Sequence, residues 1–110
     1  MLDEYKKCIE TCYLCAVACD NCAASCLEEE SLEMMRTCIK LDIQCANICR
    51  FAAQSMTLNS DSTYVQELCR LCADVCQKCG DECATHEHEH CQDCSRACHR
   101  CAEQCRKMAA

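Results

Sequence analysis

Cysteines recur along this chain at alternating intervals of three and four residues. The first run holds six of them, spaced 4, 3, 4, 3 and 4 residues apart between Cys8 and Cys26. An α-helix turns once every 3.6 residues, so side chains at this spacing share one helical face. Three similar runs follow, and the four runs together contain every cysteine of the chain: Cys8, Cys12, Cys15, Cys19, Cys22, Cys26, Cys38, Cys45, Cys49, Cys69, Cys72, Cys76, Cys79, Cys83, Cys91, Cys94, Cys98, Cys101 and Cys105. The pattern predicts four amphipathic helices, each with a stripe of thiols where leucines are usual.

Breaks between the stripes place the helices near residues 2–28, 32–57, 63–85 and 89–108. The breaks are the Glu28–Ser31 segment, the turn cluster Asn59–Ser62 and the His86–His90 segment, and Thr63 with Gln66 can form a capping box. The chain has no Pro and one Gly, which suits helices. Because the connections are short, neighbouring helices should run antiparallel. We therefore expect an all-α fold in which all 110 residues form one domain, an up-down-up-down four-helix bundle with a cysteine-lined core.

The charge and the N-terminal residues indicate which partners and which cellular location to expect. The formal net charge is -7, no basic stripe is present and aromatic residues make up 4% of the chain, so we expect no nucleic-acid partner. No segment approaches the roughly 18 apolar residues of a membrane span, so we expect no membrane association. The Met1–Lys7 segment has an early acidic pair and no apolar stretch. We therefore expect no signal peptide and a cytoplasmic location, where thiols stay reduced.

Disulfides and simple packing both explain these cysteines poorly. An odd number of cysteines, 19, cannot pair completely within one monomer. Side chains three or four residues apart on a helix have Cβ atoms about 5–6 Å apart, whereas a disulfide needs about 3.8 Å. Thiols are also too small to fill the core of a bundle well. We expect metal ions to occupy the remaining space.

Thiolate sulfur is a soft ligand that selects Cu(I), Zn(II) or iron–sulfur clusters. Iron–sulfur cysteines gather around one cluster, whereas the first run alone spans about 27 Å at 1.5 Å per residue. Each zinc site with four thiolates carries two net negative charges, and several such sites are costly to bury. A Cu(I) ion accepts two or three thiolates and can replace one thiol proton, which leaves the core neutral. The sequence therefore favours storage of many Cu(I) ions, with general zinc or heavy-metal sequestration as the alternative.

Six C-x-x-C pairs raise a second alternative, a thiol redox enzyme. That chemistry uses a helix N-terminus beside a sheet to lower the pKa of one thiol. No strand is predicted in this chain. We therefore expect no catalytic residues and no enzymatic activity.

Four other side chains are candidate metal-entrance residues or auxiliary ligands: His86, His90, Asp42 and Met34. Asp42 falls in the stripe of the second helix and is an oxygen ligand or a hydrogen-bond acceptor for thiols, unless a rotation of the helix exposes it. Met34 and Met56 extend the same stripe beyond its ends and are either weak ligands or core filler. His86 and His90 flank the last connection, where they line a metal entrance or belong to an exposed polar loop.

Apolar residues also occupy the outer faces of the first two helices, away from the thiols. Tyr13, Val17 and Ile43 lie there. Exposed apolar residues of this kind favour association between copies of the chain. We therefore expect a homo-oligomer.

With these stripes, the sequence resembles the bacterial copper storage proteins, in particular their cytosolic branch. The resemblance rests on the following segments: Cys8–Cys26, Cys38–Cys49, Cys69–Cys76, His86–Cys91 and Cys101–Cys105. It implies a four-helix bundle, usually a homotetramer, in which core cysteines bind Cu(I) that is admitted at one end. No motif identifies a copper chaperone that would deliver the metal.

The number of cysteines bounds the number of ions. Each thiolate can bridge two Cu(I) ions. If each ion takes two thiolates, 19 cysteines hold about 19 ions, and if each takes three, they hold about 13. We expect a value between these limits and nearer the upper one, because pairs on one helix can offer two sulfurs to one ion.

Overall fold

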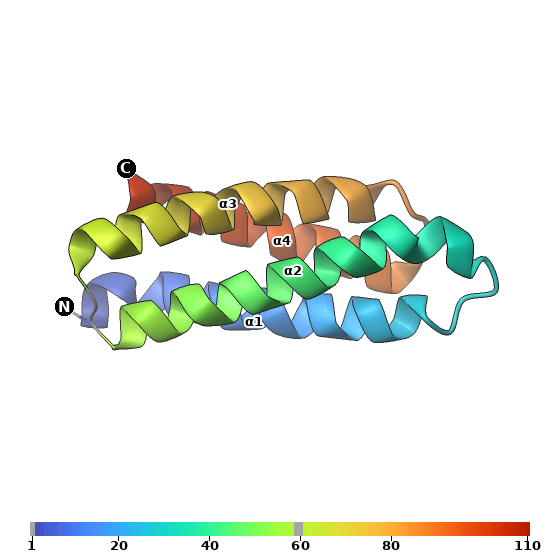
Figure 1. Ribbon diagram of the computed structural model, residues 1–110, viewed down its shortest axis with the longest axis horizontal. Coiled ribbons are helices and arrows are strands. Elements are labelled where there is room, and N and C mark those ends of the chain that lie inside the picture. The colour runs from blue at the N-terminus through green and yellow to red at the C-terminus, as the bar shows by residue number, and fades with distance from the viewer. Residues whose placement is uncertain (1, 59–60) are drawn as a thin grey trace.

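Four helices form an elongated antiparallel bundle in the computed structural model, which describes residues 2–58 and 61–110 (Figure 1). They are α1 (Leu2–Cys26), α2 (Leu32–Thr57), α3 (Ser62–Ala84) and α4 (Glu89–Ala109). The bundle measures 46 × 20 × 17 Å along its principal axes. The helix bounds lie within two residues of the predicted ones, so the all-α up-down-up-down fold is confirmed.

Each helix packs against its neighbours in the chain, and α4 packs back against α1 to close the bundle. One end, which we call the histidine end, holds the α1–α2 and α3–α4 connections; the other, the terminal end, holds the start of α1 and the end of α4 (Figure 1). Within the described ranges, none of the helices combines the length and the apolar character needed to cross a membrane.

The start of α3 differs from the predicted capping box. Asp61 is the N-cap residue, and its Oδ1 accepts hydrogen bonds from the backbone N–H groups of Thr63 at 2.9 Å and Tyr64 at 3.4 Å. A box built on Thr63 and Gln66 is therefore wrong, because the aspartate that precedes them satisfies the free N–H groups first. Asn59 and Ser60 of the predicted turn cluster lie outside the described residues.

The core of the bundle consists mainly of thiols. All 19 cysteines are buried, and none is more than 1% exposed. Buried alanines lie between the thiol stripes, including Ala16, Ala46, Ala73 and Ala102. These side chains are too small to hold the helices apart, so the sulfurs of facing helices can meet across the bore.

Larger apolar side chains gather at the terminal end. Met56, Val65 and Leu68 are buried there against the last cysteines, and Tyr5 and Met108 pack on the same cluster while partly exposed. Burial of Met56 agrees with its predicted place in the stripe of α2. Hydrocarbon side chains therefore pack beside the thiols at the terminal end.

Gly80 allows a close approach between α3 and α4. A Cβ atom at this position would lie 2.6 Å from Cδ2 and 2.7 Å from Nε2 of His99, and 3.2 Å from Cβ of Cys98. The backbone carbonyl of Gly80 also accepts a hydrogen bond of 2.9 Å from the Ser95 hydroxyl. His99 Nε2 in turn lies 2.9 Å from Oδ1 of Asp81, the residue after this glycine.

Replacing Gly80 by Ala should destabilise the metal-free protein, although Ala favours a helix interior by about 1 kcal/mol over Gly. The added methyl group must displace the His99 ring and crowd Cys98, which costs about 1–3 kcal/mol in a packed interface. Thermal unfolding followed by circular dichroism measures the loss. The G80A/H99A double variant removes the ring and should recover most of it. A G80A protein as stable as the parent would contradict the close contact.

Candidate metal site

Thiol sulfurs from different helices approach one another along the bore. The Sγ atoms of Cys38 and Cys83 lie 3.4 Å apart, and those of Cys49 and Cys76 lie 3.5 Å apart. Contacts within one helix are longer, 3.8–4.0 Å, and join cysteines four residues apart. Among the described residues, no sulfur–sulfur hydrogen bond joins the two members of a C-x-x-C pair. Facing helices, rather than single helices, therefore supply the shortest pairs of sulfurs.

The sulfurs also form groups of four. In each group every sulfur lies within 4.8 Å of the others. Three of these groups are Cys12, Cys72, Cys101 and Cys105; Cys15, Cys45, Cys49 and Cys76; and Cys19, Cys79, Cys94 and Cys98. Each group draws on three helices, so it is the closing of the bundle that assembles it. Such a set of soft, convergent donors can hold Cu(I), or a zinc ion if all four sulfurs bind one metal.

Burial favours the neutral form of the core thiols, whereas hydrogen bonds among them raise the pKa of some, such as Cys22, and lower that of others, such as Cys38. Removal from water, together with the charge on Cys38, raises the pKa of Cys91 to about 11. Burial is also the main reason why the pKa of Cys26 lies above its ordinary value. Thiolate is the form that binds metal, so metal binding here must displace protons into the solvent.

Asp42 is the only carboxylate of the described core, and it is fully buried. It accepts hydrogen bonds from four thiols: those of Cys79 at 3.1 Å, Cys94 at 3.3 Å, Cys83 at 3.5 Å and Cys38 at 3.7 Å. The prediction that it is a hydrogen-bond acceptor for thiols agrees with this geometry, and the exposed alternative is wrong. Burial first, and then the charges that develop on Cys94 and Cys38, raise its pKa to about 8.

At the histidine end, one imidazole faces the thiols. His90 Nδ1 lies 3.4 Å from Cys22 Sγ and 3.5 Å from Cys91 Sγ. Together with Cys26, these residues form a mixed group of one nitrogen and three sulfurs, all within 4.8 Å of one another. The side chain of His90 is only 15% exposed, so it does not belong to a freely exposed loop.

His86 has a different partner. Its Nε2 lies 2.8 Å from Glu82 Oε2, one turn earlier on α3, and its side chain is 12% exposed. Both predicted histidines therefore lie at the same end of the bore, but the described contacts join only His90 to cysteines.

Glu29 is a further residue of this end, which the sequence pattern marks only as part of the break after the first helix. Glu29 Oε2 lies 2.8 Å from His90 Nε2 and 3.4 Å from His88 Nδ1. The His88 and His90 rings stack with centroids 5.4 Å apart. The signal that could have found Glu29 is the meeting of the two short connections at one end of an up-down-up-down bundle.

The predicted place of Met34 in the cysteine stripe of α2 is wrong. It is 71% exposed, whereas its neighbour Met35 is 2% exposed and belongs to the core. The spacing of the α2 stripe explains the difference, because Cys45, Asp42 and Cys38 alternate by three and four residues. The next step of three reaches position 35, not 34. Met34 is therefore excluded as a ligand of the bore.

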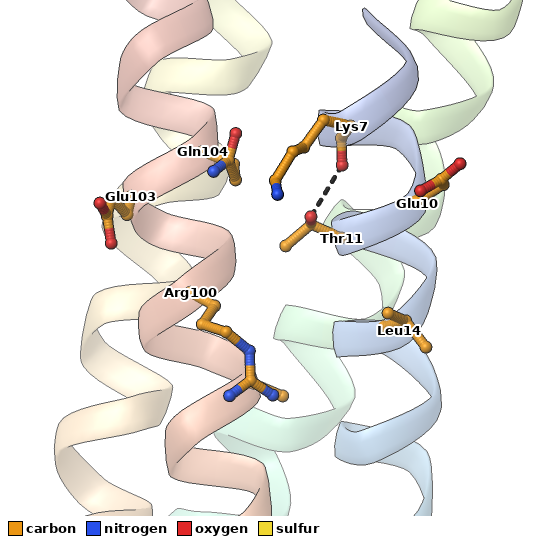
Figure 2. Close-up of a pocket in the computed structure, with 8 residues that line it drawn as sticks. Lys7, Glu10, Thr11, Leu14, Arg100, Glu103 and Gln104 are labelled. Atoms are coloured by element: carbon orange, nitrogen blue, oxygen red, sulfur yellow. Dashed lines mark hydrogen bonds between the residues drawn. The ribbon is translucent and has the colours of Figure 1, made fainter.

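A surface hollow between α1 and α4 offers a contrast to the bore (Figure 2). Figure 2 shows that polar side chains line it, including Lys7, Thr11, Arg100 and Gln104. The Thr11 hydroxyl donates to the Lys7 carbonyl at 2.7 Å, and no cysteine lines the hollow. The cysteine thiols of this protein are thus in the bore and not in this hollow.

The fold and the thiol core define a class of protein, a helical bundle that carries a row of soft-metal sites in its interior. The chain belongs to the copper storage protein family (Csp), which matches residues 1–110. It is 48% identical over 110 residues to the uncharacterised cysteine-rich protein YhjQ of Bacillus subtilis, covering 99% of this chain and 100% of that protein.

Two solved structures show the likeness in three dimensions. The Cu(I)-bound copper storage protein BsCsp3 is 48% identical, with a TM-score of 0.91 over 96% of this chain and 98% of that one. A cytosolic copper storage protein from Streptomyces lividans, solved with five coppers, is 37% identical, with a TM-score of 0.94 over 98% of this chain and 93% of that one.

Replacing Asp42 by Asn should change how stability depends on pH. The pKa of about 8 in the folded protein lies above the value of about 3.9 for an unfolded Asp. Between these values the native state binds more protons than the unfolded state, so rising pH destabilises the parent through Asp42 by up to about 1.4 kcal/mol per pH unit. Denaturant unfolding of reduced, metal-free protein at a series of pH values tests this. The parent should lose stability relative to D42N from about pH 4 to about pH 8, and parallel profiles would contradict the assignment.

Proposed function

We propose that this protein stores many Cu(I) ions in its bore, as thiolate clusters formed by the 19 buried cysteines. The observation that carries the proposal is the set of four-sulfur groups, which follow one another along the bundle and share members such as Cys15 and Cys19. Sulfurs shared between groups can bridge metal ions, so neighbouring sites can join into clusters. Membership of the copper storage protein family supports the same function.

Charge favours Cu(I) over Zn(II) as the stored ion. A Cu(I) ion that replaces one thiol proton leaves the charge of the core unchanged, whereas each zinc ion bound by four thiolates leaves two negative charges. Repeated burial of such charges without counter-ions is unfavourable. The four-sulfur groups have a geometry that zinc also accepts, so zinc sequestration is the rival to be tested.

A thiol redox enzyme fits the same residues poorly. Dithiol oxidoreductases attack a partner disulfide with an exposed, low-pKa thiol. Every C-x-x-C cysteine of this chain is 0% exposed. No substrate disulfide can reach these sulfurs while the bundle is folded, which supports a storage function without catalysis.

The histidine end is the proposed entrance for copper. His90 joins three thiols there, and the partly exposed imidazole is a ligand that an arriving ion can meet before it reaches the buried sulfurs. His86 lies at the same end but contacts Glu82, so we assign it the lesser role. The terminal end offers hydrocarbon instead.

We infer a cytosolic location and a homotetramer. The Streptomyces lividans relative is described as cytosolic, and free thiols persist in a reducing compartment. The outward-facing Tyr13, Val17 and Ile43 are 44%, 66% and 50% exposed on α1 and α2, where a neighbouring copy could cover them.

Titration of the reduced protein with Cu(I) should reach between about 13 and about 19 ions per monomer. About one proton should leave for each thiol bound, because thiolate is the form that binds Cu(I). Zn(II) should saturate at a much lower ratio, since each zinc takes more thiolates. Elemental analysis after desalting gives the ratios, and a pH-stat gives the protons. Saturation at four or five Cu(I) would refute storage, and a high ratio without proton release would place the copper on the acidic surface.

Replacing His86 and His90 together by Ala should slow copper uptake while leaving the capacity nearly unchanged, because the cysteines hold the load. Of the two single variants, His90→Ala should be the slower. Stopped-flow absorbance of sulfur-to-copper charge transfer measures the rate, and His99→Ala, on the outer surface, is the matched control. Rates equal to the control would remove the entrance assignment.

Sedimentation equilibrium should give a mass about four times the 12.4 kDa of the chain. A Val17→Asp variant should shift the mass towards the monomer, since it places a charge in the proposed interface. A parent protein that sediments only as a 12.4 kDa species would refute the assembly.

A further inference from the structure

One carboxylate links the two connections at the histidine end. Glu29 follows α1, where its backbone N–H donates to the Cys26 carbonyl at 3.2 Å and so fixes the start of the connection. From there its side chain reaches His88 and His90, which belong to the far connection and to α4. The Glu29 side chain is 28% exposed and therefore reaches solvent. A solvated glutamate is ionised near neutral pH and can only accept hydrogen bonds.

The two ring nitrogens of His90 have partners of opposite character. Nε2 lies 2.8 Å from the Glu29 carboxylate, which can only accept a hydrogen bond. Nδ1 faces the Sγ atoms of Cys22 and Cys91 at 3.4 and 3.5 Å. In a neutral imidazole only one nitrogen carries a proton, so an acceptor at Nε2 places it there. The lone pair of Nδ1 then points at the sulfurs.

We propose that Glu29 is a positioning residue for copper uptake: it holds His90 in the tautomer protonated at Nε2 and aims the free Nδ1 into the group formed with Cys22, Cys26 and Cys91. The inference rests on the proposed storage function and adds the residue that prepares the entrance nitrogen. Carboxylates that bind the far nitrogen of a metal-ligating histidine act in this way, by fixing the ring and raising its basicity.

His88 strengthens the arrangement. Its ring stacks on that of His90 at an interplanar angle of 2°, and its Nδ1 lies 3.4 Å from the same Glu29 oxygen. Rotation of the His90 ring would break both the stack and the carboxylate contact. The ring is therefore held from two sides before any metal arrives, which reduces the ordering that metal binding must supply.

The test compares Glu29→Ala and Glu29→Lys with Glu28→Ala and Glu28→Lys. Glu28 is the exposed neighbour of Glu29, so its variants make the same charge changes beside the entrance. Nitrogen-15 NMR of histidine-labelled, metal-free protein reports the tautomer of His90 without any copper. The parent should show a single tautomer protonated at Nε2. E29A should show the mixture of an unrestrained imidazole, and E29K, which places a donor at Nε2, should favour protonation at Nδ1.

Copper uptake from a Cu(I) donor at a low metal-to-protein ratio is measured on the same variants. E29A should be slower than E28A by about tenfold, and E29K slower still, with the final copper capacity unchanged. A His90 tautomer that stays the same in E29A and E29K overturns the inference, and so do uptake rates equal to those of the Glu28 variants. Failure of the parent to store copper would instead overturn the proposed function, because the tautomer measurement stands without it.

Discussion

Contact between sulfurs on facing helices determines how this bundle can close. Thiols and alanines fill positions where most bundles carry leucine, so the helices meet across a narrow seam. Little dispersion energy is available from such small side chains, and the thiols compensate by hydrogen bonding weakly to one another. Of the larger apolar residues that are buried in the described chain, Met56, Val65 and Leu68 lie at the terminal end, and Met35 lies near the histidine end. They belong to one cluster with the cysteines, so conventional packing supplements the thiols at both ends of the bundle.

The periodicity of the cysteines was enough to predict the fold and the composition of the core. A strict alternation of three and four residues places the cysteines on one face of each helix. The same spacing, continued by one step along α2, leads to Met35 rather than Met34. The helix cap at Asp61 was missed because two acceptor residues compete for the same N–H groups, and sequence alone does not rank them. Glu29 was missed for a different reason. Its role depends on the meeting of two connections in space, which the predicted up-down-up-down topology implies but no local pattern marks.

Two carboxyl groups act on the metal-binding side chains, one from inside the core and one from near the surface. Asp42 is enclosed among thiol donors and gathers four of them, so it limits the arrangements that these side chains can take before metal binds. Glu29 is near the surface and acts on a histidine instead. A carboxylate is a hard donor that Cu(I) does not favour. Both residues therefore influence the soft ligands by hydrogen bonding, without competing with them for the metal.

The entrance proposed at the histidine end has a consequence for the order in which copper is exchanged. If ions enter and leave only at that end, the bore fills from its far end. The ions that enter first then occupy the depths near Cys8 and Cys105, and those that enter last lie beside Cys26 and Cys91. On withdrawal the order reverses. Such a protein keeps a recent, exchangeable fraction at its mouth and an old, slowly renewed reserve behind it.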